Sequence, residues 1–175
     1  MRIQAWTLFL IGAAALPAAC GKPAGQADQP AAPSAPASAE APTPVPTPLT
    51  DADKKAALAT LPAAYQSADL DNGQAKFALC KSCHTTGQGE ADMVGPNLFG
   101  VFGRAAGSKP GFTYSDGLKG AHITWDAAKI DQWIANPRAM IPGTKMTYLG
   151  MENPKDRIDV GAWLKVTTTA RGAKG

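Results

Sequence analysis

The stretch Cys80-Lys81-Ser82-Cys83-His84 decides how this chain is interpreted. Two thiols lie three residues apart, and an imidazole directly follows the second thiol. This spacing is typical of a covalent attachment site for a c-type haem. Each thiol would add to one vinyl group of the haem, and the histidine would lie against one face of the iron. The motif therefore predicts one haem per chain, and that cofactor would carry the chemistry.

Other uses of these residues fit the sequence less well. A structural zinc site takes four cysteine or histidine ligands, and outside the motif the chain has only Cys20 and His122. A redox-active disulfide between Cys80 and Cys83 would be expected in a βαβ context, but no run of β-branched residues precedes Cys80. Covalent haem attachment is therefore the favoured interpretation.

The composition indicates one small domain behind an export segment and a linker. Of the 15 prolines, eight lie between residues 21 and 50, where no apolar periodicity could build a core. The formal net charge of +3 is mild, which argues against nucleic-acid binding, because that function usually shows a clustered basic face. We expect a signal peptide at 1–19, a flexible linker rich in proline and alanine at 20–50, further linker or a short helix at 51–66, the folded domain at 67–170 and a tail at 171–175.

The N-terminus predicts export. Arg2 is followed by an apolar stretch from Trp6 to Leu16 and by small residues before Cys20, which is the pattern of a secretory signal peptide. The residues around Cys20 resemble a bacterial lipoprotein cleavage box, although Leu16 lies four residues before the cysteine rather than three. We expect lipidation of Cys20 to tether the protein to a membrane in the periplasm. An uncleaved signal anchor and a soluble periplasmic form are the alternatives.

The remaining sequence predicts an all-α domain with long loops. Asp69 can cap a helix that runs to Cys80, and Thr124 can cap a second helix that Pro137 ends. Asn153 can cap a third helix. No alternating strand pattern appears. A haem would therefore supply much of the core that so short a domain lacks.

From Asp69 to about Val166 the sequence resembles the class I cytochromes c, in particular the mitochondrial-type branch with its bacterial relatives. The matching stretches follow one another along nearly the whole domain: Gly73, Phe77 and 80–84; 94–98, Gly100 and 102–104; 110–115; 123–125; and 136–137 with 141–146. The resemblance implies the small class I cytochrome c fold, in which long loops wrap around one covalent haem.

The second axial ligand of the iron must be chosen among the methionines. Met93 follows the haem motif too closely to cross easily to the opposite face, which leaves Met140, Met146 and Met151. Core packing is the commoner use of a methionine. The resemblance implies that Met146 is the ligand, and a histidine–methionine pair raises the reduction potential.

The resemblance also implies roles for residues around the haem. The carbonyl of Pro96 would accept the ring proton of His84 and orient the imidazole. Four residues would hydrogen-bond the two haem propionates or compensate their charge: Tyr114, Trp125, Arg104 and Thr144. Trp133 and Leu118 depart from the family, which commonly has a tyrosine and a polar amide at these positions. Both changes predict a drier pocket.

The charges around the predicted haem edge also differ from the family. In mitochondrial members of the family a ring of lysines surrounds the haem edge. The resemblance implies that Lys81, Arg138 and Lys145 are the basic residues of this ring that remain in this chain. Several other basic positions are occupied by apolar or acidic residues, namely Leu79, Glu90, Asp92 and Glu152. A strongly positive docking face is therefore not expected. A tethered carrier needs less long-range steering, because its effective concentration is already high.

Together these expectations describe a one-electron carrier and not an enzyme, because two filled axial positions leave no site for a substrate. By family analogy, the partners of a monomeric carrier would be a donor such as a cytochrome bc complex and an acceptor such as a terminal oxidase, in a respiratory or photosynthetic chain. A haem peroxidase or small-gas-binding haem protein is one alternative. A structural or sensory lipoprotein is another.

Overall fold

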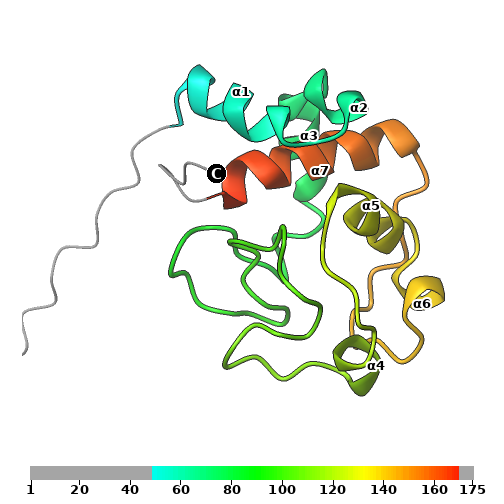
Figure 1. Ribbon diagram of the computed structural model, residues 1–175. Helices are drawn as coiled ribbons and strands as arrows, with labels where there is room; N and C mark the ends of the chain where they lie inside the picture. Colours follow the sequence, from blue (N-terminus) through cyan, green and yellow to red (C-terminus); the bar gives the residue numbers. More distant parts are fainter. Residues whose placement is uncertain (1–48, 170–175) are drawn as a thin grey trace, which may run out of the picture. The chain divides into compact units, whose positions relative to one another are not determined.

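The computed structural model describes residues 49–169 (Figure 1). The predicted signal peptide, Cys20, the linker up to residue 48 and the tail lie outside the described residues. Seven helices occur within 49–169: α1 (Asp51–Ala59), α2 (Ala63–Gln66), α3 (Leu70–Phe77), α4 (Asp116–Lys119), α5 (Ala127–Ala135), α6 (Pro137–Met140) and α7 (Pro154–Thr168). This part of the chain forms no strand, only one isolated antiparallel bridge between Ala105 and Thr124. The predicted all-α class is confirmed.

Two helices begin where their capping residues predict. The carboxylate of Asp69 accepts hydrogen bonds from the backbone N–H groups of Asp71 and Asn72 at the start of α3. The side chain of Asn153 accepts from the N–H of Lys155 at the start of α7. Each cap satisfies donors that the first turn of a helix leaves without a partner. Helix α3 ends at Phe77, and the chain continues in turns through the haem motif.

The prediction that Thr124 caps the next helix is wrong. Asp126 is the cap of α5, and its carboxylate accepts a hydrogen bond of 2.7 Å from the N–H of Lys129. Thr124 instead takes part in the bridge with Ala105, and the N–H of the next residue, Trp125, donates to a backbone carbonyl at 2.9 Å. Because this backbone is already paired with another loop, the helix cannot start before Asp126.

Helices α3 and α7 pack directly against each other, as Figure 1 shows. A Cβ on Gly73 would overlap the carbonyl oxygen of Asp159 and lie 2.8 Å from the Cβ of Trp163. The missing side chain is therefore what allows the two helices to approach so closely. Next to this point the rings of Phe77 and Trp163 lie 4.6 Å apart. Phe77 and Val160 are both fully buried, so the core begins at this contact.

The segment 51–66, for which a linker or a short helix was expected, forms α1 and α2. Both helices pack on α7, and Figure 1 shows them beside it. Leu61 and Tyr65 are buried in a cluster with Ala127 and Ala162. The hydroxyl of Tyr65 donates a hydrogen bond of 3.2 Å to the carbonyl of Ala127, 62 residues further along the chain. This segment is therefore part of the folded unit. None of the helices in 49–169 is long and apolar enough to cross a bilayer.

Candidate haem site

An apolar cavity of about 270 Å³ brings the predicted haem-binding side chains together. Cys80, Cys83 and His84 reach it from the turns that follow α3, and Met146 reaches it from the loop between α6 and α7. These two segments are more than 60 residues apart in the sequence. The fold therefore places two thiols, an imidazole and a thioether on the wall of one cavity.

Most of the cavity wall is apolar. Large hydrophobic side chains reach it from α3, α4, α5, α7 and the intervening loops, among them Phe77, Leu98, Val101, Leu118, Ile130, Trp133, Ile134 and Leu164. Trp133 and Leu118, the two departures from the family pattern, both belong to this wall. Such a lining suits a large flat hydrophobic group better than a hydrated polar substrate.

The ring of His84 is held in one orientation. Its Nδ1 lies 2.8 Å from the carbonyl oxygen of Pro96. A carbonyl can only accept, so Nδ1 must carry the proton, and Nε2 keeps a lone pair for a metal. Burial lowers the pKa of His84, while the hydrogen bond to Pro96 acts in the opposite direction. The ring is therefore neutral at physiological pH, as an iron ligand requires.

Gly95 makes room for this ring. A Cβ at position 95 would overlap Cε1 of His84 and lie 2.7 Å from its Nδ1. The N–H of Gly95 donates to the carbonyl of Cys83 at 2.8 Å, which ties this loop to the haem motif. Sequence reasoning placed Gly95 in a matching stretch but did not assign it a role. Its proximity to His84 is visible only in three dimensions.

Both thiols of the motif are half-buried and form no disulfide. Burial, followed by the influence of the neighbouring Cys83, raises the pKa of Cys80 to about 11. The metal-binding form of cysteine is the thiolate, which this environment disfavours. Among residues 49–169 no three His, Cys, Asp or Glu side chains gather as a metal-binding group.

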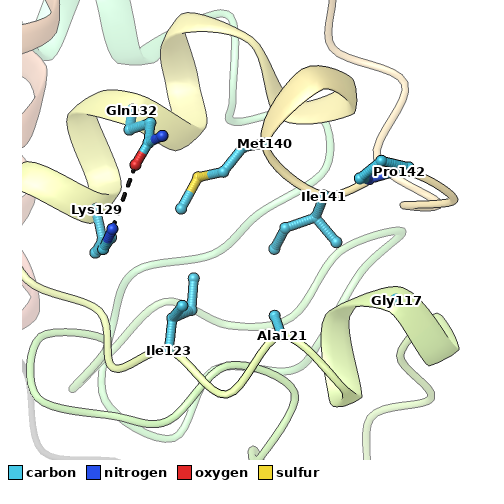
Figure 2. Close-up of a pocket in the computed structure, with 8 residues that line it drawn as sticks. All are labelled: Gly117, Ala121, Ile123, Lys129, Gln132, Met140, Ile141 and Pro142. Carbon is cyan, nitrogen blue, oxygen red and sulfur yellow. Dashed lines mark hydrogen bonds between the residues drawn. The ribbon is translucent and has the colours of Figure 1, made fainter.

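Of the methionines in the described residues, Met146 alone lines the haem cavity. The side chain of Met140 points into a separate hollow of about 350 Å³ beside Ile123 (Figure 2). Met151 is buried in the hydrophobic core, and Met93 is half exposed. Of the three candidate ligands left by the sequence, Met146 is therefore the one that lies on the wall of this cavity.

Three of the four residues expected at the propionates, Tyr114, Trp125 and Thr144, lie on the cavity wall. Tyr114 and Trp125 are buried, and burial raises the pKa of Tyr114, so its hydroxyl stays protonated and can donate. The hydroxyl of Thr144 accepts a hydrogen bond of 3.1 Å from the N–H of Met146. Thr144 therefore also shapes the loop that presents the methionine.

The fourth residue, Arg104, is not part of the cavity wall. Its half-buried guanidinium donates to the carbonyls of Phe99 and Asn97, at 3.1 Å and 3.3 Å. Its positive charge still acts on Tyr114, where it partly offsets the rise in pKa that burial causes. Arg104 is therefore placed to act on Tyr114, which lies on the cavity wall.

Sequence reasoning missed Tyr148, which also lines the cavity. It follows Met146 by two residues in a segment without helix. In an extended chain, alternate side chains point to the same side, so this spacing was a usable signal. Phe112 was missed as well, and its ring packs edge-on against Tyr114 at 4.8 Å.

The residues present fit a covalently attached haem. Two thiols, one imidazole nitrogen with a free lone pair and one thioether share a cavity with apolar walls and a few polar groups. Cys80, Cys83, His84 and Met146 would hold such a group.

Known proteins resemble this chain over most of their own length, although no protein-family model matches it. Cytochrome c2 of Rhodomicrobium vannielii is 46% identical over 109 residues, which cover 62% of this chain and 87% of that protein. Cytochrome c-554 of Methylosinus trichosporium is 38% identical over 66% of this chain and 88% of its own. The solved structure of cytochrome cH from Methylobacterium extorquens matches with a TM-score of 0.53 and 44% identity, over 55% of this chain and 97% of that one. The chain therefore belongs to the class I cytochrome c family, haem-based electron carriers with one covalently bound c-type haem.

Proposed function

We propose that this protein is a one-electron carrier tethered to a membrane, with Cys80 and Cys83 as the haem attachment sites and His84 and Met146 as the axial ligands of the iron. The observation that carries the proposal is the convergence of these four side chains on one apolar cavity. When bound, the haem supplies a reversible ferrous–ferric couple. His84 and Met146 would hold the iron, which would leave no position for a substrate, so the proposed role is electron transfer and not catalysis.

The chain tunes the site through its wall and through the orientation of its ligands. Pro96 holds the His84 ring by a hydrogen bond to Nδ1, which increases the donor strength of Nε2. Trp133 and Leu118 keep water away from the cavity, and a dry environment disfavours additional charge. A thioether ligand acts in the same direction, since it favours the reduced state. We therefore expect a positive reduction potential.

The polar side chains of the cavity wall would receive the propionates. Tyr114, Trp125 and Thr144 lie on the wall and have hydroxyl or indole donors. Arg104 would balance propionate charge from a position behind the wall, held there by two backbone carbonyls. A buried charge needs such pairing, because its desolvation is costly.

The location and partners belong to the same proposal. Lipidation of Cys20, followed by the proline-rich linker, would tether the domain in the periplasm, where 30 residues of extended polyproline II could span about 90 Å. The reach would let a monomeric domain move between a donor such as a cytochrome bc complex and an acceptor such as a terminal oxidase. The relatives support this setting because they include a bacterial cytochrome c2 and cytochrome c-554.

The proposal is tested on the purified full-length protein by intact mass, optical spectroscopy and redox titration. We expect the mass of one haem bound to the chain and a low-spin spectrum that does not change with carbon monoxide. Met146→Ala should admit carbon monoxide or imidazole to the iron and lower the potential. Met140→Ala is the matched control, because Met140 lines the separate hollow, and it should leave both properties unchanged.

Two results would contradict the proposal. A protein without covalent haem would remove its basis. Rapid carbon monoxide binding by the unmodified protein would favour a gas-binding protein or a peroxidase. The tether is tested separately by the N-terminal mass of the membrane fraction, where Cys20→Ser should release the protein. A Cys20 without an acyl group would refute the lipid anchor alone.

A further inference from the structure

We propose that the hollow beside α5, drawn in Figure 2, is a second ligand site and that it binds a small aromatic monocarboxylate. The hollow has a volume of about 350 Å³. Within residues 49–169, no residue that lines this hollow also lines the haem cavity. The inference therefore does not depend on the redox role of the haem.

The floor of the hollow is apolar and of a size that suits a small molecule. Small-molecule sites in proteins are concave, mostly apolar and about 300–1,000 Å³ in volume. Figure 2 shows four apolar side chains converging on one space: Ala121, Ile123, Met140 and Ile141. The thioether of Met140 adds a preference, because its sulfur makes favourable contacts with the edges of aromatic rings. A ligand with a compact aromatic body would therefore fit this floor.

The polar side chains of the hollow come from one helix. Lys129 and Gln132 lie one turn apart on α5, and both line the hollow. The ammonium of Lys129 donates to the side-chain oxygen of Gln132 at 3.4 Å. An ammonium has three N–H groups and a side-chain amide has two, so several donors remain for a ligand. Such a set of donors recognises a carboxylate, because hydrogen bonds to an ionised acceptor are the strong ones.

The positive charge of Lys129 lacks an ion-pair partner among residues 49–169. The carboxylate of Asp126 accepts a hydrogen bond of 2.7 Å from the backbone N–H of Lys129, not from its ammonium. Lys119 differs, because it is paired with Asp116 on α4 at 2.9 Å. Lys129 is also the one cationic residue of the described lining. A ligand with a single negative charge would therefore complete the site.

The wall of the hollow is formed before any ligand binds. The N–H of Ile141 donates to the carbonyl of Pro137 at 3.0 Å, which fixes the end of α6. A Cβ on Gly117 would lie 2.6 Å from the carbonyl oxygen of Pro142, so α4 and the segment after α6 are in direct contact. A preorganised site loses less entropy when it binds.

A strained residue lies in the same wall. His122 stands between the lining residues Ala121 and Ile123 and has a φ of 51°. Within residues 49–169, it is the only residue other than glycine with a positive φ. The left-handed region is uncommon for residues with a side chain, and strained residues cluster at active sites and ligand-binding sites. This observation is independent of the volume and the charge, and it points to a ligand at the same wall.

The test uses the full-length ferrous holoprotein, isotopically labelled at its backbone nitrogens, and sodium benzoate as the probe. Two-dimensional NMR spectra are recorded while the benzoate concentration is raised to about 10 mM, which exceeds the Kd of about 1 mM expected for so small a ligand. We expect saturable shifts of the amide signals of Ile123, Lys129 and Gln132.

Two further probes separate the contributions of the ring and of the charge. Cyclohexanecarboxylate has the same charge and a similar size but no aromatic ring, and it should bind at least about threefold more weakly than benzoate. Benzyl alcohol keeps the ring and lacks the charge, and it should bind at least about tenfold more weakly.

Substitutions test the two sides of the hollow. Lys129→Gln should weaken benzoate binding at least about tenfold, because it removes the charged donor. Ala121→Leu should abolish the saturable shifts by filling the hollow. Lys55→Gln is the matched control, because it removes an exposed lysine from α1 and should leave the Kd unchanged. The optical spectrum of the haem shows whether each variant is folded.

Three results would overturn the proposal. The first is the absence of saturable shifts at about 10 mM benzoate. The second is equal weakening by Lys129→Gln and Lys55→Gln, which would indicate attraction to positive charge in general. The third is tighter binding of cyclohexanecarboxylate than of benzoate, which would refute the aromatic preference. None of these results would affect the electron-carrier function, because the haem cavity has a different lining.

Discussion

Replacement of Gly95 by alanine tests whether His84 keeps its orientation only because residue 95 has no side chain. The new Cβ would overlap Cε1 of His84 and lie 2.7 Å from Nδ1 and 2.8 Å from Nε2. Carbon atoms in comfortable contact are about 3.5–4.0 Å apart. Either the imidazole or the loop must therefore move by about 1 Å.

Neither group can move without cost. The ring is held by the 2.8 Å hydrogen bond to Pro96, and the loop is held by the 2.8 Å hydrogen bond from the N–H of Gly95 to Cys83. Overpacking costs about 1–3 kcal/mol, and a lost hydrogen bond costs about 1 kcal/mol more. We expect a loss of about 2–4 kcal/mol in the free energy of unfolding. At about 4 °C per kcal/mol for a domain of this size, Tm should fall by about 8–16 °C.

The assay is thermal unfolding of the ferric holoprotein, with the optical spectrum and the reduction potential recorded on the same sample. A displaced imidazole should change the ligand-field bands, which a purely structural effect would leave intact. Gly120→Ala is the matched control. Its nearest contact would be 3.4 Å from the carbonyl oxygen of Asp116, and its φ is −86°, so alanine should be tolerated there. A Gly95→Ala protein with the Tm and spectrum of the control would refute the reasoning.

Three further substitutions test the packing around α7. Gly73→Ala should lower the free energy of unfolding by at least about 2 kcal/mol in denaturant titration. The Cβ of the new alanine would meet the backbone of Asp159, which cannot move aside as a flexible side chain could. An unchanged denaturation midpoint would contradict the close contact between the two helices. Asp159→Asn should cost about 2–3 kcal/mol at pH 7, because the buried carboxylate accepts hydrogen bonds from the N–H of Asp69, the amide of Asn72 and the ammonium of Lys155. Burial acts to raise the pKa of Asp159, but hydrogen bonds outweigh burial and lower the pKa. The stabilisation by this carboxylate therefore exists above about pH 4 and disappears as the pH falls through the folded-state pKa. Acid unfolding at the same pH in the wild-type and Asp159→Asn proteins would argue against this. Tyr65→Phe should lower the free energy of unfolding by about 1 kcal/mol, because it removes the hydrogen bond to Ala127. If a protease cleaves the α1–α2 segment equally fast in the wild-type and Tyr65→Phe proteins, this hydrogen bond does not hold the segment in place.

The features that could be predicted from the sequence depend on short-range chemistry. The caps at Asp69 and Asn153 act within three residues, so an aspartate or asparagine in front of an apolar pattern was enough to place the helix starts. The haem motif is local in the same sense, because two thiols and an imidazole lie within five residues. The error at Thr124 shows the limit of this reasoning. Thr124 and Asp126 are both good caps, and a bridge to Ala105 decided between them.

Contacts between distant segments could not be predicted. The hydrogen bond from Tyr65 to Ala127 joins residues 62 positions apart, and it makes the segment 51–66 part of the domain. The gap that Gly95 leaves for His84 depends on how one loop folds back over the motif. The position of Arg104 behind the cavity wall depends on two carbonyls of its own loop. Each outcome was set by backbone geometry that no pattern of residue types encodes.

These contacts indicate how a short attachment motif becomes a tuned redox site. Cys80, Cys83 and His84 could attach a haem in any exposed loop, but three features of the tertiary structure constrain what such a haem would do. The Pro96 carbonyl fixes the tautomer of His84, the loop after α6 brings Met146 to the same cavity, and a wall of large hydrophobic side chains keeps out water. A substitution that leaves the motif intact but wets the cavity should therefore change the reduction potential while the covalent haem is retained.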